Sequence, residues 1–412
     1  MKNRAMDMGE RRGCSASISI VLHDLSPGGT ERIAIRLASR WAQTGRSVRL
    51  ICGTDEGALG GLISPAIDVE VVHPRVGRGL GSRGRLARAV GAALVREPCD
   101  VLFLPGNFHL PVADCVTTLP PPLRPSVVAQ LSNALRRPGR SRLGQAIFEA
   151  RTRRLMRGVS CAIALSDAAR NEADEVLGRR LAIALPSPVL EDSVAPPIAP
   201  PSGPPLIVAI GRLVEQKDFS LAIRAFAQVS ASDARLVILG EGAERPQLAE
   251  LIASLGLGRR VELAGYVGDV RPWLDRARCL LLSSRYEGYP AVVVEALAAG
   301  RPVVATPCGG SIVDLISTPQ AGVIAERRTP QALAAALERQ LAAPRPDPVA
   351  LARQVAHHRI GPVSTAYLHA FDAARSSLPA EPLIQLNSWP LPGRAGEADV
   401  FAPMPDAMGV TR

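Results

Sequence analysis

Short apolar runs, rich in β-branched residues, alternate along this chain with stretches whose apolar residues follow a helical period. In the first half the apolar runs cover residues 17–25, 47–53, 100–106, 126–132 and 161–166. Such uniformly apolar runs are typical of parallel strands that are buried on both faces. The stretch 30–45 has helical spacing and ends at Gly45, a residue that suits a helix C-terminus. The alternation predicts βαβ units and a doubly wound sheet.

The second half repeats this pattern. Its apolar runs cover residues 206–211, 236–240, 261–265, 279–284 and 301–307. Two such halves predict an α/β protein with two Rossmann-like doubly wound domains. We expect the two sheets to face each other across a cleft at the carboxyl ends of their strands, where open α/β sheets bind ligands. Because one fold serves many reactions, individual residues have to indicate the function.

Proline content marks the domain boundaries. Residues 185–205 are dense in proline, which interrupts helices and central strands, and residues after about 376 lack any periodicity. The predicted organisation is a flexible N-terminus at 1–16, an N-terminal Rossmann-like domain at 17–188, a linker at 189–205, a C-terminal Rossmann-like domain at 206–345, a helical segment at 346–376 and a disordered tail at 377–412.

Composition agrees with two buried cores. The 412 residues are 47% hydrophobic and 21% charged. The seven cysteines form no CxxC pair, so reduced and mostly buried thiols are expected rather than a zinc site or a disulfide framework. We found no signal-peptide pattern and no apolar run of membrane-spanning length. We therefore expect a cytoplasmic protein, soluble or bound peripherally to the inner face of the membrane.

The net charge of +10 is unevenly distributed. Residues 1–190 carry 27 Lys and Arg against 16 Asp and Glu, whereas residues 191–412 carry 21 against 22. This asymmetry indicates that the N-terminal half faces something anionic. Aromatic residues are 3% of the chain and no nucleic-acid-binding motif is present, so DNA and RNA are not expected partners.

One segment concentrates this positive charge among apolar residues. A basic amphipathic pattern suits an anionic membrane surface or a lipid-diphosphate acceptor. A solvated, arginine-rich helix is the alternative. The arginines are Arg136, Arg137, Arg140, Arg142, Arg151, Arg153, Arg154 and Arg157, interleaved with Leu143, Ile147, Phe148, Leu155 and Met156.

The most informative segment follows the strand that ends near Ser284. A loop there leads into a helix from about residue 291 to 299. Backbone N–H groups of Gly288 and Tyr289, beside the positive helix terminus, can hold sugar hydroxyls or phosphate oxygens. Glu287 in the loop and Glu295 in the helix can hold hydroxyls of a sugar and a ribose. The alternative is a solvated helix start, where acidic residues are favoured in any case.

Two cations follow another strand. Arg212 comes directly after Gly211, and Lys217 precedes an amphipathic helix, so both can reach one diphosphate. Lys217 is one of only two lysines among 48 basic residues, which favours a position that requires a compact ammonium group over a plain surface cation. Gly28 and Gly29, between the first strand and first helix, allow close approach to a phosphate or sugar, or form a simple turn.

These segments together resemble the retaining, family-4-type glycosyltransferases, the glycosyl transferases group 1. The resemblance covers residues 17–375 and is strongest at GRLVEQKDFSLAIRAF, LVILGEG with LAGYV, the Glu287–Glu295 spacing, and TPCGGSIVDLI with AGVI. It implies a GT-B fold with an N-terminal acceptor domain and a C-terminal donor domain. It also implies hexosyl transfer from a UDP- or GDP-type sugar to a glycan or lipid-linked acceptor in cell-surface polysaccharide or glycolipid biosynthesis, without a metal or other cofactor.

The resemblance also implies residue roles. Catalysis would rest on Glu287, Lys217 and Arg212, with His109 as the nearest candidate for the histidine that many members use. The donor site would comprise Gly28, Gly29, Gly211, Arg212, Lys217, Tyr266, Val267, Glu287, Gly288, Tyr289, Pro290 and Glu295, with Arg212 and Lys217 at the diphosphate, Glu295 at the ribose and Tyr266-Val267 at the nucleobase. Acceptor or membrane contacts are expected from the basic amphipathic pattern, at Arg136, Arg137, Arg151, Arg153 and Arg154. Attack on the same face of the sugar, assisted by the departing phosphate, requires no carboxylate nucleophile, unlike retaining glycosidases.

One position departs from the family pattern. Many members have a histidine after the strand that corresponds to residues 126–131, where this chain has Ser132 and Asn133. His109 is the nearest candidate at the same strand ends, or a loop histidine without a role; His23 is expected to be structural. Two other functions remain open: a nucleotide-sugar epimerase or phosphorylase on the same fold, and a non-catalytic partner subunit that binds nucleotide sugars.

Overall fold

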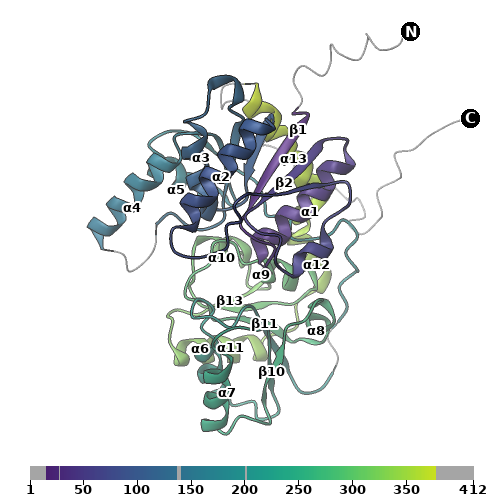
Figure 1. Cartoon of the computed structure of the whole chain (residues 1–412). Helices are drawn as coiled ribbons and strands as arrows, with labels where there is room; N and C mark the ends of the chain where they lie inside the picture. The colour runs from purple at the N-terminus through teal and green to yellow at the C-terminus, as the bar shows by residue number, and fades with distance from the viewer. Residues whose placement is uncertain (1–14, 27, 137–140, 200–201, 377–412) are drawn as a thin grey trace, which may run out of the picture. The chain divides into compact units, whose positions relative to one another are not determined.

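The computed structural model describes residues 15–26, 28–136, 141–199 and 202–376, which divide into two compact units (Figure 1). The N-terminal unit contains the described residues up to Pro188 and from Ile360 onward; the C-terminal unit is Val189–Arg359. The predicted tail at 377–412, nearly all of the predicted flexible N-terminus, and Arg137 and Arg140 lie outside the described residues.

The N-terminal unit is built on a seven-stranded parallel sheet in the order β3-β2-β1-β4-β5-β6-β7. Its strands are β1 (Ser17–Leu22), β2 (Ser47–Cys52), β3 (Asp68–Val71), β4 (Val101–Leu104), β5 (Ser126–Leu131), β6 (Val159–Ala164) and β7 (Ala182–Ala184). Its helices are α1 (Gly29–Gln43), α2 (Ser82–Arg96), α3 (Leu110–Val116), α4 (Arg142–Leu155), α5 (Asp167–Leu177) and α13 (Ile360–Arg375), with short 3₁₀ turns η2 (Ala58–Leu62), η3 (Asn107–His109) and η4 (Pro121–Leu123).

Helices cover both faces of this sheet. Helices α1 and α13 pack on one face, where Trp41 contacts the rings of Phe103, Tyr367 and Phe371 with centroids 4.9–6.2 Å apart. Helices α2, α3 and α5 supply buried residues to the core on the other face. Apolar strands with a helical layer on each side are what the alternating sequence pattern predicts.

The C-terminal unit repeats the design with a six-stranded parallel sheet in the order β10-β9-β8-β11-β12-β13. Its strands are β8 (Leu206–Ile210), β9 (Arg235–Leu239), β10 (Val261–Gly265), β11 (Cys279–Leu282), β12 (Val303–Ala305) and β13 (Gly322–Ile324). Its helices are α6 (Phe219–Phe226), α7 (Arg245–Ser254), α8 (Arg271–Arg276), α9 (Ala291–Ala298), α10 (Gly310–Leu315), α11 (Pro330–Ala342) and α12 (Pro348–Gln354), with the 3₁₀ turn η5 (Ala356–His358). Helices α6, α7 and α11 cover one face, and α8, α9, α10 and α12 the other.

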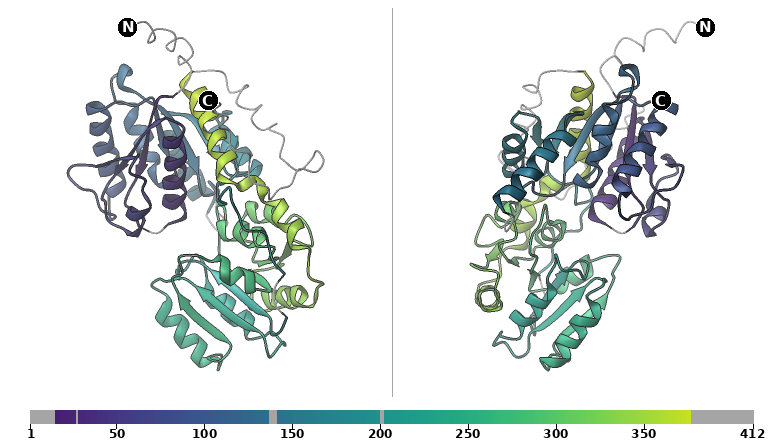
Figure 2. Two further views of the ribbon diagram at one scale, coloured as in Figure 1. Left: turned by 90° about the vertical axis from the view of Figure 1, so that its right-hand side faces the viewer. Right: turned by 60° about the vertical axis from the view of Figure 1, so that its left-hand side comes forward.

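Helix α13 belongs to the N-terminal unit although it follows the C-terminal unit in sequence. It lies along the N-terminal sheet (Figure 2), and the indole Nε1 of Trp41 donates to the carbonyl of Ser364 at 3.1 Å. The chain leaves the N-terminal unit after Pro188 and returns at Ile360. The boundary at residue 188 coincides with the expected one, whereas the expected C-terminal helical segment is divided between the two units.

The proline-dense segment is attached to the C-terminal unit in its described part. Arg271 donates to the carbonyl of Ala195 at 2.9 Å, and Arg301 donates to that of Ile198 at 2.6 Å. Backbone carbonyls of a proline-rich segment have few N–H partners within that segment. These two arginines satisfy such carbonyls and hold the segment against the C-terminal unit.

Three strands were not predicted from the apolar runs. They are β3, β7 and β13, and each lies at an edge of its sheet. Edge strands are short and partly exposed, so they lack the continuous apolar run that marks a central strand. Within the described residues, no helix has the length and hydrophobicity needed to cross a membrane.

Candidate functional site

The candidate site lies at the carboxyl ends of β8 and β11 in the C-terminal unit. These two strands are neighbours at the centre of the sheet, and the strand order reverses between them. Open α/β sheets bind ligands at such a switch point, because the loops from adjacent strands diverge to opposite faces. The loop after β8 carries Gly211, Arg212 and Lys217, and the loop after β11 carries Glu287.

An ion pair joins these loops. Lys217 Nζ lies 2.6 Å from Glu287 Oε1, and the hydroxyl of Ser284 donates to the same oxygen at 2.6 Å. The side chains of Lys217 and Glu287 are only 18% and 7% exposed, so their attraction is screened less than that of a surface pair. The carboxylate is therefore held in one orientation by two donors.

Backbone contacts fix the positions of the loops. The hydroxyl of Ser283 donates to the carbonyl of Lys217 at 2.8 Å, and Arg285 N–H donates to the carbonyl of Gln216 at 2.8 Å. Glu287 N–H donates to the carbonyl of Cys308, in the loop after β12, at 2.7 Å. Three strand ends thus converge on the ion pair. A site held this way is more rigid than its loop location alone suggests.

Two glycines allow this convergence. Gly240, after β9, has φ +149°, and a Cβ there would lie 1.9 Å from the carbonyl oxygen of Gly211. Gly211 itself has φ +155°, and a Cβ would lie 3.2 Å from Cε of Lys217. Side chains at these positions would strain the backbone and displace the loop that carries the lysine.

Arg212 is exposed and makes no side-chain hydrogen bond or ion pair with any described residue, which leaves its guanidinium available to an incoming anion. The nearby Asp218 caps helix α6 and accepts from Leu221 N–H at 3.3 Å. Asp218 is in turn paired with Arg328 and lies 3.5 Å from Arg285. No group of three or more His, Cys, Asp and Glu side chains gathers as a metal site within the described ranges.

The start of α9 is organised differently from a simple helix terminus. Pro290 is its N-cap residue, and the hydroxyl of Ser311 donates to the carbonyl of Gly288 at 2.7 Å. The hydroxyl of Tyr289 lies 2.9 Å from Nε2 of His358, so this side chain is tied to the protein. A sugar contact by Tyr289 is then expected from its backbone. Glu295 is half-buried on α9.

The remaining donor residues stay predictions. Tyr266, directly after β10, is 59% exposed and Val267 is half-buried. In the N-terminal unit, Gly28 is the N-cap residue of α1 and Gly29 its first residue. A methyl group on Gly29 would meet nothing within 4 Å, so the backbone there is open to a ligand.

The structure places His109 in an enclosed position in the N-terminal unit. It is 3% exposed, and burial with the neighbouring His23, Arg78 and Arg83 lowers its pKa to about 3, so the imidazole is neutral at physiological pH. None of the ring nitrogens of His109 or the buried His23 has a hydrogen-bond partner among the described residues. The edge of each ring meets Phe108. A catalytic role for His109 requires this enclosure to open, and it stays a prediction.

Ser132, where the family pattern has a histidine, lies close to the His109 segment. The side-chain oxygen of Asn107 accepts from Asn133 N–H at 3.1 Å and from the hydroxyl of Ser132 at 3.4 Å. The loops after β4 and β5 are therefore joined by a small polar network at the place where the family histidine would lie.

The arginine-rich segment is partly neutralised. Arg136 pairs with Glu149 and Glu175 at 3.3 and 2.6 Å, and Arg153 donates to the carbonyl of Val176. Arg151 is exposed, and Arg154 lies 3.9 Å from Asp114 with 71% of its side chain exposed. The predicted helix is present as α4.

A known family matches the segment that contains the candidate site. Residues 204–343, which contain β8 to α11 and the Lys217–Glu287 pair, match the family model of glycosyl transferases group 1. The match covers about a third of the chain, and this segment is therefore similar to the group 1 glycosyltransferases. The predicted resemblance to this family is confirmed for this segment.

Individual relatives match this chain over segments of a little more than 100 residues. The lipopolysaccharide core biosynthesis glycosyltransferase LpsE of Rhizobium meliloti is 38% identical over 106 residues, 26% of this chain and 31% of LpsE. The N-acetylgalactosamine-N,N'-diacetylbacillosaminyl-diphospho-undecaprenol 4-alpha-N-acetylgalactosaminyltransferase of Campylobacter jejuni is 35% identical over 122 residues, 29% of this chain and 33% of the relative. The matches thus span about a third of the relatives' own length.

Solved structures resemble a larger part of the chain. HepE of Anabaena, in complex with UDP and glucose, has a TM-score of 0.66 at 20% identity and covers 89% of this chain and 99% of its own. WaaG, a glycosyltransferase involved in lipopolysaccharide biosynthesis, has a TM-score of 0.64 at 19% identity and covers 86% and 98%. At this identity the likeness concerns the fold, and it confirms GT-B architecture with two Rossmann-like units.

Several contacts at the site were not predicted from the sequence. Ser284 stands at the end of a predicted strand, but nothing in the local sequence marks its hydroxyl as a donor to Glu287. The Asp218–Arg328 pair joins residues 110 positions apart, and Tyr289 meets His358 from 69 positions away. The partners of a residue such as Glu287 can be found only when the fold is known, because they come from distant parts of the sequence.

Proposed function

We propose that this protein is a retaining, metal-independent glycosyltransferase that moves a sugar from a UDP- or GDP-type donor to a glycan or lipid-linked acceptor. The observation that carries the proposal is the largely buried Lys217–Glu287 pair, with Arg212 on the same loop as Lys217, at the switch point of the segment matched to the family. The process is the biosynthesis of a cell-surface polysaccharide or glycolipid.

The site's chemistry fits this reaction. Arg212 and Lys217 supply two positive charges to the donor diphosphate and stabilise the charge that grows as the nucleotide departs. Glu287, held by Ser284, accepts hydrogen bonds from hydroxyls of the transferred sugar. The incoming acceptor hydroxyl then loses its proton to the leaving phosphate on the same face of the sugar, so the anomeric configuration is kept without a carboxylate nucleophile.

The named relatives support the substrate classes. One acts in lipopolysaccharide core biosynthesis, another transfers N-acetylgalactosamine to a diphospho-undecaprenol acceptor, and HepE was solved with UDP-glucose. A UDP-sugar is accordingly the first donor to test, and a lipid diphosphate the first acceptor.

The test is product analysis with a panel of nucleotide sugars. We expect labelled sugar to move to an acceptor with retained anomeric configuration by NMR, and the rate to be unchanged by EDTA. Glu287→Ala should reduce the rate by about a thousandfold or more while nucleotide binding remains measurable. Glu215→Ala, an exposed glutamate in the facing loop, serves as the matched control and should keep the rate.

Other outcomes point elsewhere. Sugar altered in place or released by phosphate would identify an epimerase or a phosphorylase. Binding without turnover for every donor and acceptor would identify a partner subunit. Full activity of Glu287→Ala would contradict the assignment of this place as the donor site.

We further propose peripheral attachment to the cytoplasmic face of a membrane through α4. Leu143 and Ile147 are 72% and 62% exposed, and they lie one turn apart on a helix that also presents Arg151 and Arg154. Exposed apolar residues flanked by arginines suit an anionic lipid surface. The double variant Leu143→Ser and Ile147→Ser should lose co-sedimentation with phosphatidylglycerol vesicles but not donor binding; Leu62→Ser, at another exposed apolar residue, is the control.

A further inference from the structure

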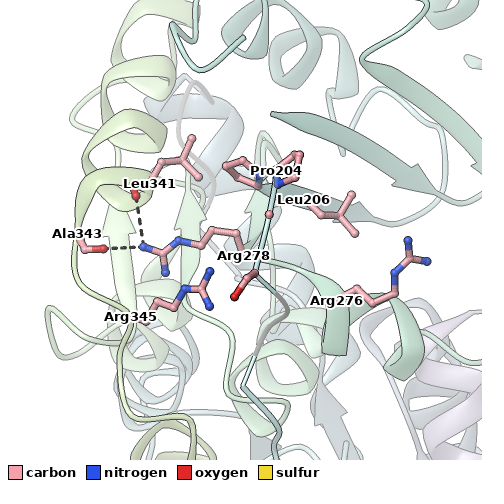
Figure 3. A pocket seen from close by; sticks show the side chains of 10 residues that line it. Pro204, Leu206, Arg276, Arg278, Leu341, Ala343 and Arg345 are labelled. Atoms are coloured by element: carbon pink, nitrogen blue, oxygen red, sulfur yellow. Dashed lines mark hydrogen bonds between the residues drawn. The ribbon is translucent and has the colours of Figure 1, made fainter. Parts of the chain in front are cut away.

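A second basic region lies in the C-terminal unit, away from the donor residues. A pocket of about 380 Å³ opens at the amino ends of β8 and β11, where Leu206 begins one strand and Arg278 directly precedes the other (Figure 3). The Lys217–Glu287 pair follows the carboxyl ends of the same two strands. Strands of four to five residues separate the two edges by about 15 Å.

Three arginines line this pocket. They are Arg276 at the end of α8, Arg278 before β11 and Arg345 after α11, and no residue of the lining is acidic. Figure 3 shows the three side chains around the opening, beside Pro204 and Leu206. The lining therefore combines positive charge with an apolar wall.

Arg278 is held in place without being neutralised. Its Nη2 lies 2.6 Å from the carbonyl of Ala343 and 3.3 Å from that of Leu341, at the end of α11. These acceptors are uncharged carbonyls, and no carboxylate among the described residues pairs with this side chain. A guanidinium already fixed by its protein contacts loses less entropy when it binds an anion.

Arg276 differs from other arginines of the same unit. Its guanidinium lies 5.8 Å from the ring centroid of Trp273, and it has no ion pair within the described residues. By contrast, Arg271 pairs with Asp275 at 2.7 Å and Arg245 with Glu241 at 2.8 Å. Asp275, next to Arg276 in sequence, is thus already paired with another arginine.

Like charges are crowded here. Burial and the charge of Arg345 lower the pKa of Arg278. Burial also lowers the pKa of the neighbouring Arg301 to about 10, with Arg271 and Arg345 adding to the effect. Cations close enough to disfavour one another's charge favour a bound anion, because it relieves their repulsion.

We propose that this pocket binds a phosphate-bearing anion, contacted by Arg276, Arg278 and Arg345, as a site separate from the donor site. The planar guanidinium groups present paired N–H donors that match phosphate oxygens. The phosphate belongs either to a dissolved small molecule or to a lipid headgroup, and the experiment separates these sources.

The experiment measures binding of inorganic phosphate and pyrophosphate by calorimetry to the full chain carrying Lys217→Ala, which weakens the donor site. A further Arg276→Ala and Arg345→Ala change should weaken pyrophosphate binding at least tenfold. Arg259→Ala, an exposed loop arginine outside the pocket, should leave it unchanged. Arg345→Glu repeats the test with a single change, and circular dichroism checks the fold of each variant.

The second arm uses phosphatidylglycerol and phosphatidylcholine vesicles. Loss of phosphatidylglycerol binding in the pocket variants, with no binding of free phosphate, assigns the site to a lipid headgroup. Equal binding of phosphate, pyrophosphate and both vesicle types by the pocket variants and the parent chain overturns the proposal. Sugar transfer is measured in parallel in the chain with Lys217 intact. A failure of this site therefore leaves the donor site's activity visible.

Discussion

The two units share a sheet topology but treat polar groups at the switch point in opposite ways. In the C-terminal unit, Lys217 and Glu287 form an ion pair across the ends of β8 and β11, and the hydroxyl of Ser284 donates to the same carboxylate. In the N-terminal unit, the segments after β1 and β4 bring His23 and His109 together, buried and without hydrogen-bond partners among the described residues. One switch point holds an ion pair; the other holds two buried imidazoles without hydrogen-bond partners among the described residues.

This difference separates fold from function. The same strand order creates both places, and only the loops decide which groups occupy them. Buried unpaired nitrogens cost stability, so the N-terminal unit retains groups that a purely structural core would replace. The comparison therefore yields opposite expectations for substitutions in the two units.

The largest expected effect comes from matched glycines. Gly240→Ala should destabilise the protein by roughly 3–5 kcal/mol, because its Cβ overlaps the carbonyl of Gly211 and its φ is positive. Gly29→Ala meets no neighbour and should change the free energy of unfolding by less than about 1 kcal/mol. Urea unfolding of both variants measures this. A loss of transfer by Gly29→Ala with unchanged stability would place that backbone at the donor.

The next effect concerns the charged switch point. Lys217→Ala should weaken UDP binding about a hundredfold, since it removes a diphosphate cation and leaves a buried carboxylate with one donor fewer. Lys217→Arg should recover only part of the affinity, because Gly211 lies against the lysine stem and the larger guanidinium does not fit the same space. Calorimetry with UDP checks both, with the exposed Arg224→Ala as control. Equal affinities for all three would contradict the assignment.

The smallest effect concerns His109 at the switch point of the N-terminal unit. The pKa of His109 is about 3 in the folded protein and about 6.5 when unfolded, so the unfolded chain binds more protons between these values. Stability is then lost as pH falls from 6.5 toward 3. Between pH 6.5 and pH 5 the parent protein should lose about 1.5 kcal/mol more than His109→Leu. Unfolding at the two pH values measures this, and identical losses would show that the imidazole is not buried.

The same variant tests catalysis. If His109→Leu keeps its transfer rate, the histidine is structural, whatever its effect on stability. If the transfer rate of His109→Leu falls while its free energy of unfolding at pH 5 exceeds that of the parent protein, then the buried imidazole serves the reaction and lowers the stability of the fold.

Much of the arrangement of the candidate site could be predicted from the sequence. Strand ends at Gly211 and Ser284 follow from apolar runs, and Arg212, Lys217 and Glu287 follow from motif spacing in the loops after them. The unusual lysine in an arginine-rich chain pointed to a position where a compact cation is needed, and it is the lysine that forms the buried pair. Local periodicity and motif order suffice for these features, because both are properties of contiguous residues.

Contacts between distant segments depended on the tertiary structure. The bond of Lys217 to Glu287 joins residues 70 positions apart, and helix α13 returns to the N-terminal unit through Trp41 and Ser364. The pocket arginines come from three elements, and no sequence motif groups them. The sequence alone determined which elements form and which residues stand at their ends. Only the folded sheet decided which charges meet. The energy of an ion pair depends on the distance between its charges, and that distance is set by how the strands are connected and ordered in the sheet, not by spacing along the chain.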